Sequence, residues 1–197
     1  MIVDGHCDET YKEKIVCYLD ILAWKGKIEK TSGNHSEANK LYNIYMDFIE
    51  SFRVIEKNYP SLRINIISDS IFLSWDLNYY ANSMKILNIL KYQIQQFVMD
   101  DLLIRGGIFK GKLFHDNDKI FGPALCEAYR LESKCAVYPR IIFGEDIKKE
   151  FFADFQGEKN DPMGDYRKTV KNDLDGFYYL DYLAFHCRTQ IEGKINQ

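Results

Sequence analysis

The segment Leu62–Trp75 reads LRINIISDSIFLSW, and it is the most informative stretch for the fold. Two apolar runs, Leu62–Ile67 and Ile71–Trp75, flank the short polar sequence SDS at positions 68–70. Short runs rich in β-branched residues and bounded by turn-forming residues are typical of paired strands. The segment therefore predicts a β-hairpin with Asp69 at its acidic turn.

The predicted hairpin stands between elements of alternating type. A strand at Ile15–Leu22 and a helix at Glu37–Asn58 are expected before it, and the polar residues between them, Lys25–Ser36, predict a loop or a frayed helix start. A helix at Ala81–Met99 and a strand at Leu102–Phe109 are expected after it. Both helices repeat apolar residues at intervals of three and four. The order β-α-β-β-α-β predicts an α+β fold with a ferredoxin-like core.

A C-terminal αβ extension follows this core. Gly106 and Gly107 are expected to interrupt or bulge the strand before it, or to let another backbone come close. The later elements are a polar turn at His115–Lys119, a helix at Pro123–Lys134, a strand at Val137–Phe143, a short helix at Glu145–Phe152 and a strand at Phe177–Leu183. One domain over residues 1–197 is expected, with its core at about 15–143 and the extension at 144–197.

Composition excludes several classes of protein. The 197 residues are 46% hydrophobic and 28% charged, which is typical of a soluble globular domain. With a net charge of -3, the protein lacks the positive electrostatic field that non-specific nucleic-acid binding needs. No apolar run approaches the roughly 18 residues of a membrane span. The five cysteines are scattered, with no CxxC pair, which favours reduced thiols and a cytoplasmic location.

Asp20 and Asp69 are the most informative candidates for chemistry. Asp20 lies near the end of the first predicted strand, and Asp69 lies between the hairpin strands. These strands are neighbours in a ferredoxin-like sheet, so the two acids can converge on one edge. Two such carboxylates suit Mg²⁺ or Mn²⁺ shared with substrate phosphates. The alternative is that Asp20 caps a turn and Asp69 is an ordinary hairpin acid.

Two further stretches narrow the interpretation. Residues 105–108 read RGGI with Gly111 after them, and residues 120–133 read IFGPALCEAYRLES. Together with YLDIL at 18–22 and ISDSI at 67–71, they resemble the class III nucleotide cyclases in both motif and order. The resemblance spans roughly residues 15–143.

The resemblance implies a two-metal site. Asp20 and Asp69, with the backbone carbonyl of Ile21, would hold two divalent cations, Mg²⁺ or Mn²⁺. Arg130 matches the arginine that stabilises charge at the α-phosphate of a nucleoside triphosphate. Such a site closes a 3′,5′-cyclic nucleotide and releases pyrophosphate.

The resemblance also implies how the phosphates and a partner subunit are held. Backbone N–H groups after Ile21 would cradle the terminal phosphates, at Leu22, Ala23 and Trp24. The family forms its sites between two subunits, so a homodimer is expected, with Arg130 reaching the partner's metals. Lys168 or Lys171 is a candidate contact for pyrophosphate, and a solvated basic face is the alternative.

Three positions depart from the purine cyclases. Asn65 stands where a base-reading Lys or Glu is usual, Lys119 stands where an Asp or Cys is usual, and Cys126 replaces the transition-state Asn. A site without the purine-reading groups should not select adenine or guanine strongly, because specificity rests on paired polar contacts.

These departures make the chain similar to the pyrimidine cyclases of the bacterial Pycsar anti-phage system, which make cyclic UMP or cyclic CMP as a signal. The substrate expected is then UTP or CTP. Asn65, Arg105, Tyr59 and Lys119 are the candidate contacts for the substrate. Arg105 could donate to a uracil carbonyl, which favours UTP, or it could instead form a salt bridge on its strand.

Other functions stay open at this point. A purine-specific adenylate or guanylate cyclase has the same motifs, and a catalytically inert homologue would bind nucleotide or a partner protein. The intact acidic pair and Arg130 argue against the inert homologue. An RNA-binding module of this fold is disfavoured, because the aromatic strands that it needs are missing.

Overall fold

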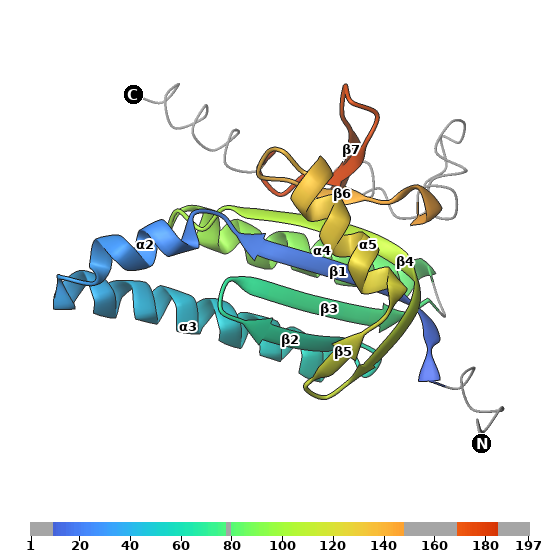
Figure 1. Ribbon diagram of the computed structural model, residues 1–197, viewed down its shortest axis with the longest axis horizontal. Helices are drawn as coiled ribbons and strands as arrows, with labels where there is room; N and C mark the ends of the chain where they lie inside the picture. Colours follow the sequence, from blue (N-terminus) through green and yellow to red (C-terminus); the bar gives the residue numbers. More distant parts are fainter. Residues whose placement is uncertain (1–9, 78–79, 148–168, 185–197) are drawn as a thin grey trace, which may run out of the picture.

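The computed structural model describes residues 10–77, 80–147 and 169–184, with the side chains of 80–82 left out (Figure 1). Its helices are α2 (Trp24–Thr31), α3 (His35–Asn58), α4 (Tyr80–Val98), α5 (Pro123–Arg130) and the π-helical turn η1 (Leu131–Cys135). Its strands are β1 (Lys12–Ile21), β2 (Arg63–Ile67), β3 (Ser70–Asp76), β4 (Ile104–Asp116), β5 (Lys119–Phe121), β6 (Ile141–Phe143), β7 (Val170–Asn172) and β8 (Tyr178–Leu180).

The described strands form one sheet in the order β2-β3-β1-β4-β6-β8-β7, with β5 paired to the end of β4. The first four strands of the chain are antiparallel neighbours, whereas β6 runs parallel to β4. The order β2-β3-β1-β4 with two intervening helical segments is the ferredoxin-like arrangement. The predicted α+β fold with a ferredoxin-like core is therefore confirmed.

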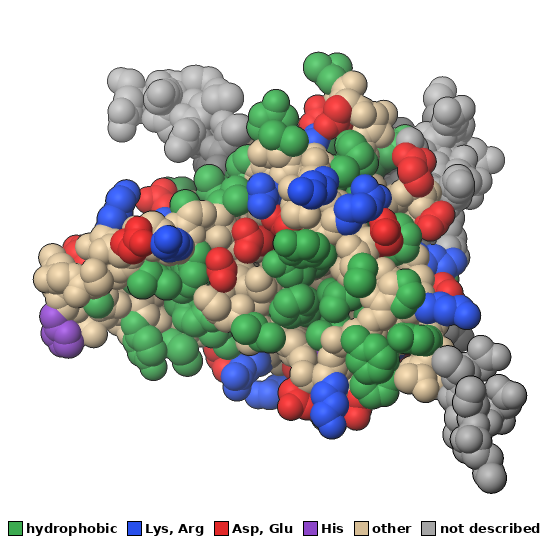
Figure 2. Space-filling model, in the orientation of Figure 1, with side chains coloured by type: hydrophobic (Ala, Val, Ile, Leu, Met, Phe, Trp, Pro, Cys, Tyr) green, Lys and Arg blue, Asp and Glu red, His purple; other side chains and the backbone are tan. Residues whose placement is uncertain are grey.

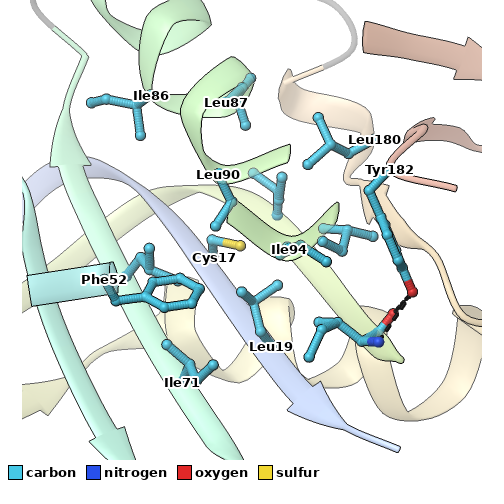
Figure 3. Close-up of a cluster of buried hydrophobic side chains, with 14 of the residues drawn as sticks. Cys17, Leu19, Phe52, Ile71, Ile86, Leu87, Leu90, Ile94, Leu180 and Tyr182 are labelled. Carbon is cyan, nitrogen blue, oxygen red and sulfur yellow. Dashed lines mark hydrogen bonds between the residues drawn. The ribbon is translucent and has the colours of Figure 1, made fainter. Parts of the chain in front are cut away.

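The two faces of the sheet are covered differently. Along β1, alternate residues such as Cys17 and Leu19 point into the main core beneath α3 and α4 (Figure 3), because successive side chains of a strand point to opposite faces. Val16 and Tyr18 point to the other face, where α5 packs. Apart from α5 and η1, no described helix covers this second face of the sheet (Figure 1), and we call it the open face.

The glycines of β4 allow a close approach rather than a break. β4 is one continuous strand of 13 residues, so the predicted interruption at Gly106 and Gly107 is wrong. A Cβ on Gly107 would lie 2.3 Å from the carbonyl oxygen of Ala128 and 2.7 Å from Leu131 Cβ. Because Gly107 has no side chain, α5 and η1 can lie directly on β4. The predicted alternative, a close approach of another backbone, is therefore the one that the structure shows.

The segment predicted as a loop is mostly helical. Residues 24–31 form α2, and α3 begins at His35. Asn34 caps α3, because its Oδ1 accepts hydrogen bonds from the N–H groups of Ser36 and Glu37 at 3.1 and 3.2 Å. The low apolar content of residues 25–36 hid this helix, which buries only Trp24.

The extension adds strands to the edge beyond β4. The strand predicted at 137–143 covers only 141–143, the one predicted at 177–183 covers 178–180, and β7 was not predicted. Of the short helix predicted at 145–152, residues 148–152 lie outside the described part. None of the helices in the described residues is long and apolar enough to cross a membrane.

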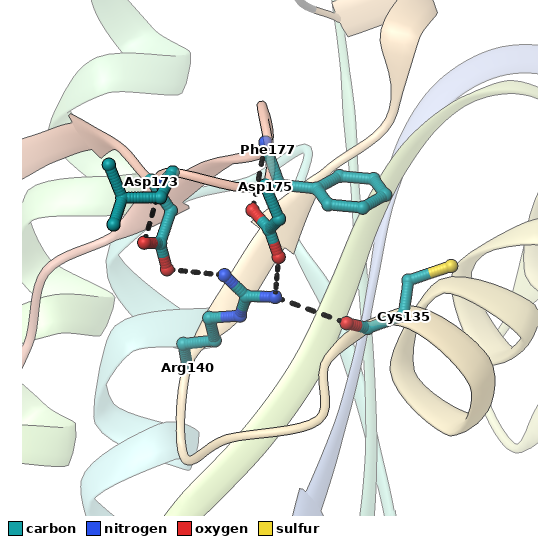
Figure 4. Close-up of polar contacts among 6 residues, drawn as sticks. Cys135, Arg140, Asp173, Asp175 and Phe177 are labelled. Atoms are coloured by element: carbon teal, nitrogen blue, oxygen red, sulfur yellow. Dashed lines mark hydrogen bonds and ion pairs between the residues drawn. The ribbon is translucent and has the colours of Figure 1, made fainter.

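Arg140 fastens this extension to η1 (Figure 4). Its side chain is 5% exposed, and it donates to Asp173 at 2.5 Å, to Asp175, and to the carbonyl oxygen of Cys135 at 3.2 Å. The guanidinium is buried whereas the two carboxylates are partly exposed, so removing the carboxylates would leave a buried positive charge unpaired, which is costly. Arg140 therefore holds the β7–β8 turn against the end of η1.

Candidate active site

Asp20 and Asp69 lie side by side where β1 ends and β2 turns into β3. Asp20 is the register partner of Ser70, the residue after Asp69. The N–H of Ile21 donates to the carbonyl oxygen of Asp69 at 3.0 Å, which ties the turn to the end of β1. The structure thus brings together the two acids that the predicted topology places on one edge.

Side chains from α2 and α3 hold the Asp69 turn. Ser68 has a positive φ of 55°. The hydroxyl of Tyr45, on α3, donates to the carbonyl oxygen of Ser68 at 2.7 Å. The Tyr45 ring in turn packs on Trp24, with centroids 4.9 Å apart. Trp24 therefore serves the site as a buried support for the Asp69 turn.

The site is crowded with negative charge. Burial, Glu132 and Asp69 together raise the pKa of Asp20 from its ordinary 3.8 to about 6, against the opposing effect of Arg105. Glu132 is only 3% exposed, so little water screens its charge. Three acids near one another with one guanidinium leave an excess of negative charge at the end of β1.

This donor set fits a divalent cation shared with a substrate. No group of three or more His, Cys, Asp or Glu side chains within the described residues is arranged to hold a metal by itself. Asp20 and Asp69 supply two carboxylates, and the carbonyl of Ile21 is the predicted third ligand. Mg²⁺ is commonly held by one or two carboxylates with substrate phosphates completing its coordination.

Arg105, a candidate base reader, is engaged by an acid of its own chain. Its Nε and an outer guanidinium nitrogen both lie 2.5 Å from Glu132 Oε1. The alternative of a strand salt bridge is thus the one that the structure shows. Arg105 sits opposite Asp20 in the β1–β4 register, so it moderates the charge of the acids rather than standing free for a base.

Fewer backbone N–H groups are available to bind the phosphates than the sequence predicts. The N–H of Leu22 already donates to the carbonyl oxygen of Leu103 at 2.9 Å. Ala23 has a left-handed φ of 58° and begins α2 without a side-chain cap. The first N–H groups of a helix have no partner within it and favour anions. With the N–H of Leu22 already paired, the N–H groups of Ala23 and Trp24 at the start of α2 are the remaining predicted phosphate donors.

Asn65 and Lys119 lie away from the two acids. Asn65 is in the middle of β2, where its Oδ1 is 2.9 Å from Nε2 of His115. Lys119 begins β5 and is exposed, in a hairpin that pairs it with Asp116. The structure therefore separates Asn65 and Lys119, within one chain, from the predicted metal ligands.

Tyr59 is placed elsewhere. It follows the end of α3 and is partly buried against the main core on the helix-covered side of the sheet. Its N–H donates to Glu56 and its carbonyl accepts from Leu62, before β2 begins. Nothing in this position brings Tyr59 toward Asp20 or Asp69.

Arg130 ends α5 and is turned outward. Its side chain is 52% exposed and its Nε lies 2.7 Å from Glu127 Oε2. Cys126, one turn earlier, is also exposed. Lys171 is exposed on β7, and Lys168 lies outside the described residues. Arg130 is thus outside the acid cluster of its own chain and is exposed on the surface.

The open face carries apolar surface beside these groups (Figure 2). Tyr18 packs against Phe72 and Tyr129, with ring centroids 5.2 and 5.4 Å apart. Tyr129 is 54% exposed, and Ile67, at the end of β2, is 65% exposed. Exposed apolar residues grouped beside polar ones are characteristic of a surface that binds another protein.

Glu132 and Tyr45, near the two acids, and His115, beside Asn65, were not predicted as functional residues from the sequence. Glu132 belongs to the RLE motif, but only the π-helical turn η1 directs it onto Arg105. A π turn shifts the following residues around the helix axis, which periodicity does not reveal. Tyr45 and His115 each depend on a contact across at least 23 positions in the sequence.

No protein-family model matches the chain, and no curated protein matches it. Solved structures do. A bacterial light-regulated adenylyl cyclase aligns with a TM-score of 0.55 at 18% identity, over 93% of this chain and 98% of that one. The guanylyl cyclase domain of the RhoGC fusion protein from the aquatic fungus Blastocladiella emersonii gives 0.58 at 16% identity, over 87% and 95%.

A third structure extends the comparison to a bound nucleotide. The guanylate cyclase domain of RhGC from Catenaria anguillulae, in complex with GTP, aligns with a TM-score of 0.53 at 15% identity, over 86% of this chain and 96% of that one. Identities this low establish the fold and leave the activity to be argued from the site. The chain has the fold of the class III adenylyl and guanylyl cyclase domains.

Proposed function

We propose that this chain is a metal-dependent pyrimidine nucleotide cyclase, which converts UTP or CTP into cyclic UMP or cyclic CMP and pyrophosphate. The observation that carries the proposal is the meeting of Asp20 and Asp69 at the end of β1, with the pKa of Asp20 raised to about 6. A carboxylate pKa raised by burial and by neighbouring acids is a property of sites that bind cations or perform catalysis. The fold adds support, because the similar structures are cyclase domains.

Asp20, Asp69 and the Ile21 carbonyl would hold the two divalent cations, Mg²⁺ or Mn²⁺. When bound, the cations supply the positive charge that acidifies the ribose 3′-hydroxyl and neutralises the triphosphate. The start of α2 would bind the terminal phosphates through the N–H groups near Ala23 and Trp24. Arg105 stays paired with Glu132 and keeps that buried acid from repelling the triphosphate.

The reaction is an intramolecular phosphoryl transfer. The 3′-oxygen forms a bond to the α-phosphorus, the bond from that phosphorus to the bridging oxygen of the β-phosphate breaks, and the hydroxyl proton passes to solvent. Positioning and charge stabilisation dominate such reactions. Arg130 would stabilise the charge that develops at the α-phosphate.

We further propose that the active enzyme is a homodimer that joins through the open face. Arg130 is exposed and pairs with Glu127 rather than with the acids of its own chain. The candidate base contact Asn65 likewise stands apart from Asp20 and Asp69 within one chain. A second copy placed on Tyr129 and its apolar surroundings would bring Arg130 and Asn65 of one chain to the acids of the other.

The pyrimidine assignment rests on Asn65 and Lys119 in the base-reading positions, and on the resemblance to the Pycsar cyclases. On the same resemblance, we propose that the cyclic product is a second messenger in bacterial anti-phage defence. A purine cyclase is the second candidate, because the similar structures are described as adenylyl and guanylyl cyclases, one in complex with GTP.

A product assay tests this function. The purified chain is incubated with each of the four nucleoside triphosphates and Mn²⁺, and the products are identified by mass. We expect cyclic UMP or cyclic CMP with one pyrophosphate per turnover, and none from Asp69→Asn. Exclusive formation of cyclic AMP or cyclic GMP would overturn the pyrimidine assignment, and no cyclic product from any substrate would overturn the activity.

A further inference from the structure

Three polar side chains form a hydrogen-bonded chain on the open face, and His115 lies at its centre. Its Nδ1 is 2.8 Å from Ser74 Oγ on β3, and its Nε2 is 2.9 Å from Asn65 Oδ1 on β2. Ser74 is completely buried and His115 is 8% exposed, whereas Asn65 is only partly buried. The chain therefore leads from the interior to the surface and ends on Asn65.

The buried end determines the direction of these hydrogen bonds. Within the described residues, the hydroxyl of Ser74 has His115 as its one hydrogen-bond partner. A buried hydroxyl needs an acceptor for its proton, so Ser74 donates to Nδ1. A neutral imidazole carries a single N–H, which then lies on Nε2 and donates to Asn65 Oδ1.

The imidazole is held in its neutral form. Burial, Lys14 and Arg63 lower the pKa of His115 from 6.5 to about 4, against the opposing effect of Asp116. At neutral pH the ring therefore has one donor and one acceptor, as the hydrogen-bond directions require. A protonated ring would have two donors and could not accept from Ser74.

Asn65 is left with a fixed orientation. Its side-chain oxygen accepts a hydrogen bond from His115, so its amide nitrogen, with two N–H groups, points away from His115. No described residue accepts a hydrogen bond from this nitrogen. The surface at Asn65 therefore offers a donor and matches a ligand that offers an acceptor.

We propose that Ser74, His115 and Asn65 set the base preference, so that the enzyme uses UTP and rejects CTP. This inference rests on the proposed function. Uracil carries a carbonyl oxygen at ring position 4, where cytosine carries an amino group. The outward amide of Asn65 pairs with the carbonyl and meets the amino group donor to donor. Asn65 is the contact to the base, and His115 and Ser74 are positioning residues.

The first test exchanges the donor for an acceptor. Asn65→Asp is nearly isosteric, and its carboxylate still accepts from His115 while its second oxygen faces the base. We expect the ratio of kcat/KM for UTP to that for CTP to fall roughly ten- to hundredfold, because the free-energy cost of one mispaired polar contact corresponds to about that factor. Activity with CTP should rise above that of the unmodified protein.

The second test separates positioning from packing. His115→Phe removes both hydrogen bonds, frees the amide of Asn65 to rotate, and should bring the UTP-to-CTP ratio toward one. His115→Gln is the matched control, because its amide nitrogen can still donate to Asn65, and the ratio should stay in favour of UTP. A purely structural role of His115 would lower turnover with both substrates and leave their ratio unchanged.

The outcomes distinguish this inference from the proposed function. If no triphosphate gives a cyclic product, the proposed function fails. If the unmodified protein prefers CTP, or if Asn65→Asp leaves the ratio within twofold, the function stands and the inference is overturned. Asn65 is partly exposed on an edge strand, so its variant provides a result even where His115→Phe fails to fold.

Discussion

Asp20→Asn should make the metal-free protein more stable while it removes activity. In the folded chain the pKa of Asp20 is raised from 3.8 to about 6, and burial, Glu132 and Asp69 are the causes, in that order. A rise of that size corresponds to at most about 3 kcal/mol of destabilisation by the carboxylate. Because the side chain is only half-buried, solvent screening reduces the expected effect to about 1–2 kcal/mol.

The sign of the effect gives it a characteristic pH dependence. The folded state holds the Asp20 proton more tightly than the unfolded state, so this group makes the protein less stable as the pH rises from about 4 to about 6. Above that range the penalty is complete, and below it the penalty is absent. Asn carries no charge at any pH, so the advantage of Asp20→Asn should be full at pH 7.5 and disappear near pH 4.

Thermal unfolding in buffer with a chelator measures the difference. For a chain of this length, about 1–2 kcal/mol raises Tm by roughly 3–6 °C. Asp47→Asn, which changes an exposed acid on α3, is the control and should leave Tm within about 1 °C. Added Mn²⁺ should stabilise the unmodified protein and not Asp20→Asn. A lower Tm for Asp20→Asn at pH 7.5, or an equal gain at pH 4, would refute the electrostatic reasoning.

Three other variants test the supports of the site. Asp69→Ala should abolish cyclase turnover and leave the size of the assembly unchanged by chromatography; retained turnover would eliminate the metal role of Asp69. Gly107→Ala should destabilise the fold by about 1–3 kcal/mol in denaturant unfolding, because its Cβ would meet Ala128 O at 2.3 Å, whereas Gly26→Ala, with nothing within 4 Å, should be neutral or stabilising. Tyr45→Phe removes the hydrogen bond to Ser68 and should weaken Mn²⁺ binding roughly threefold to tenfold in titration calorimetry; unchanged affinity would show that the turn needs no support from α3.

The core of the fold was predictable because local patterns determine it. The hairpin at 62–75 and the helices before and after it each show their own periodicity, and their order restricts the topology to few arrangements. The helix at 24–31 was missed because it contributes a single buried residue, so it has little apolar periodicity to detect. β7 was missed because its three residues, Val170–Asn172, include a single apolar residue, so they show neither an apolar run nor an alternation.

The candidate site was predictable only in part. Asp20 and Asp69 could be placed together, since the topology fixes which strand ends meet. The pairing of Arg105 with Glu132 depends on the π-helical turn η1 and could not be read from spacing. The orientation of Asn65 depends on His115 and Ser74, which lie 50 and 9 positions further along the chain, on different strands.

Mixing two inactive variants tests the central claim most directly. Asp69→Ala lacks an acid of the metal site, and Arg130→Ala lacks the guanidinium that the partner is proposed to donate. If each site takes its acids from one subunit and its arginine from the other, mixed dimers keep one intact site. We expect the two variants, inactive alone, to regain about a quarter of the unmodified turnover when their subunits are exchanged at equal amounts, because random pairing makes half of the dimers mixed and each mixed dimer has one of its two sites intact. Dimers that exchange and yet show no cyclic product would contradict it.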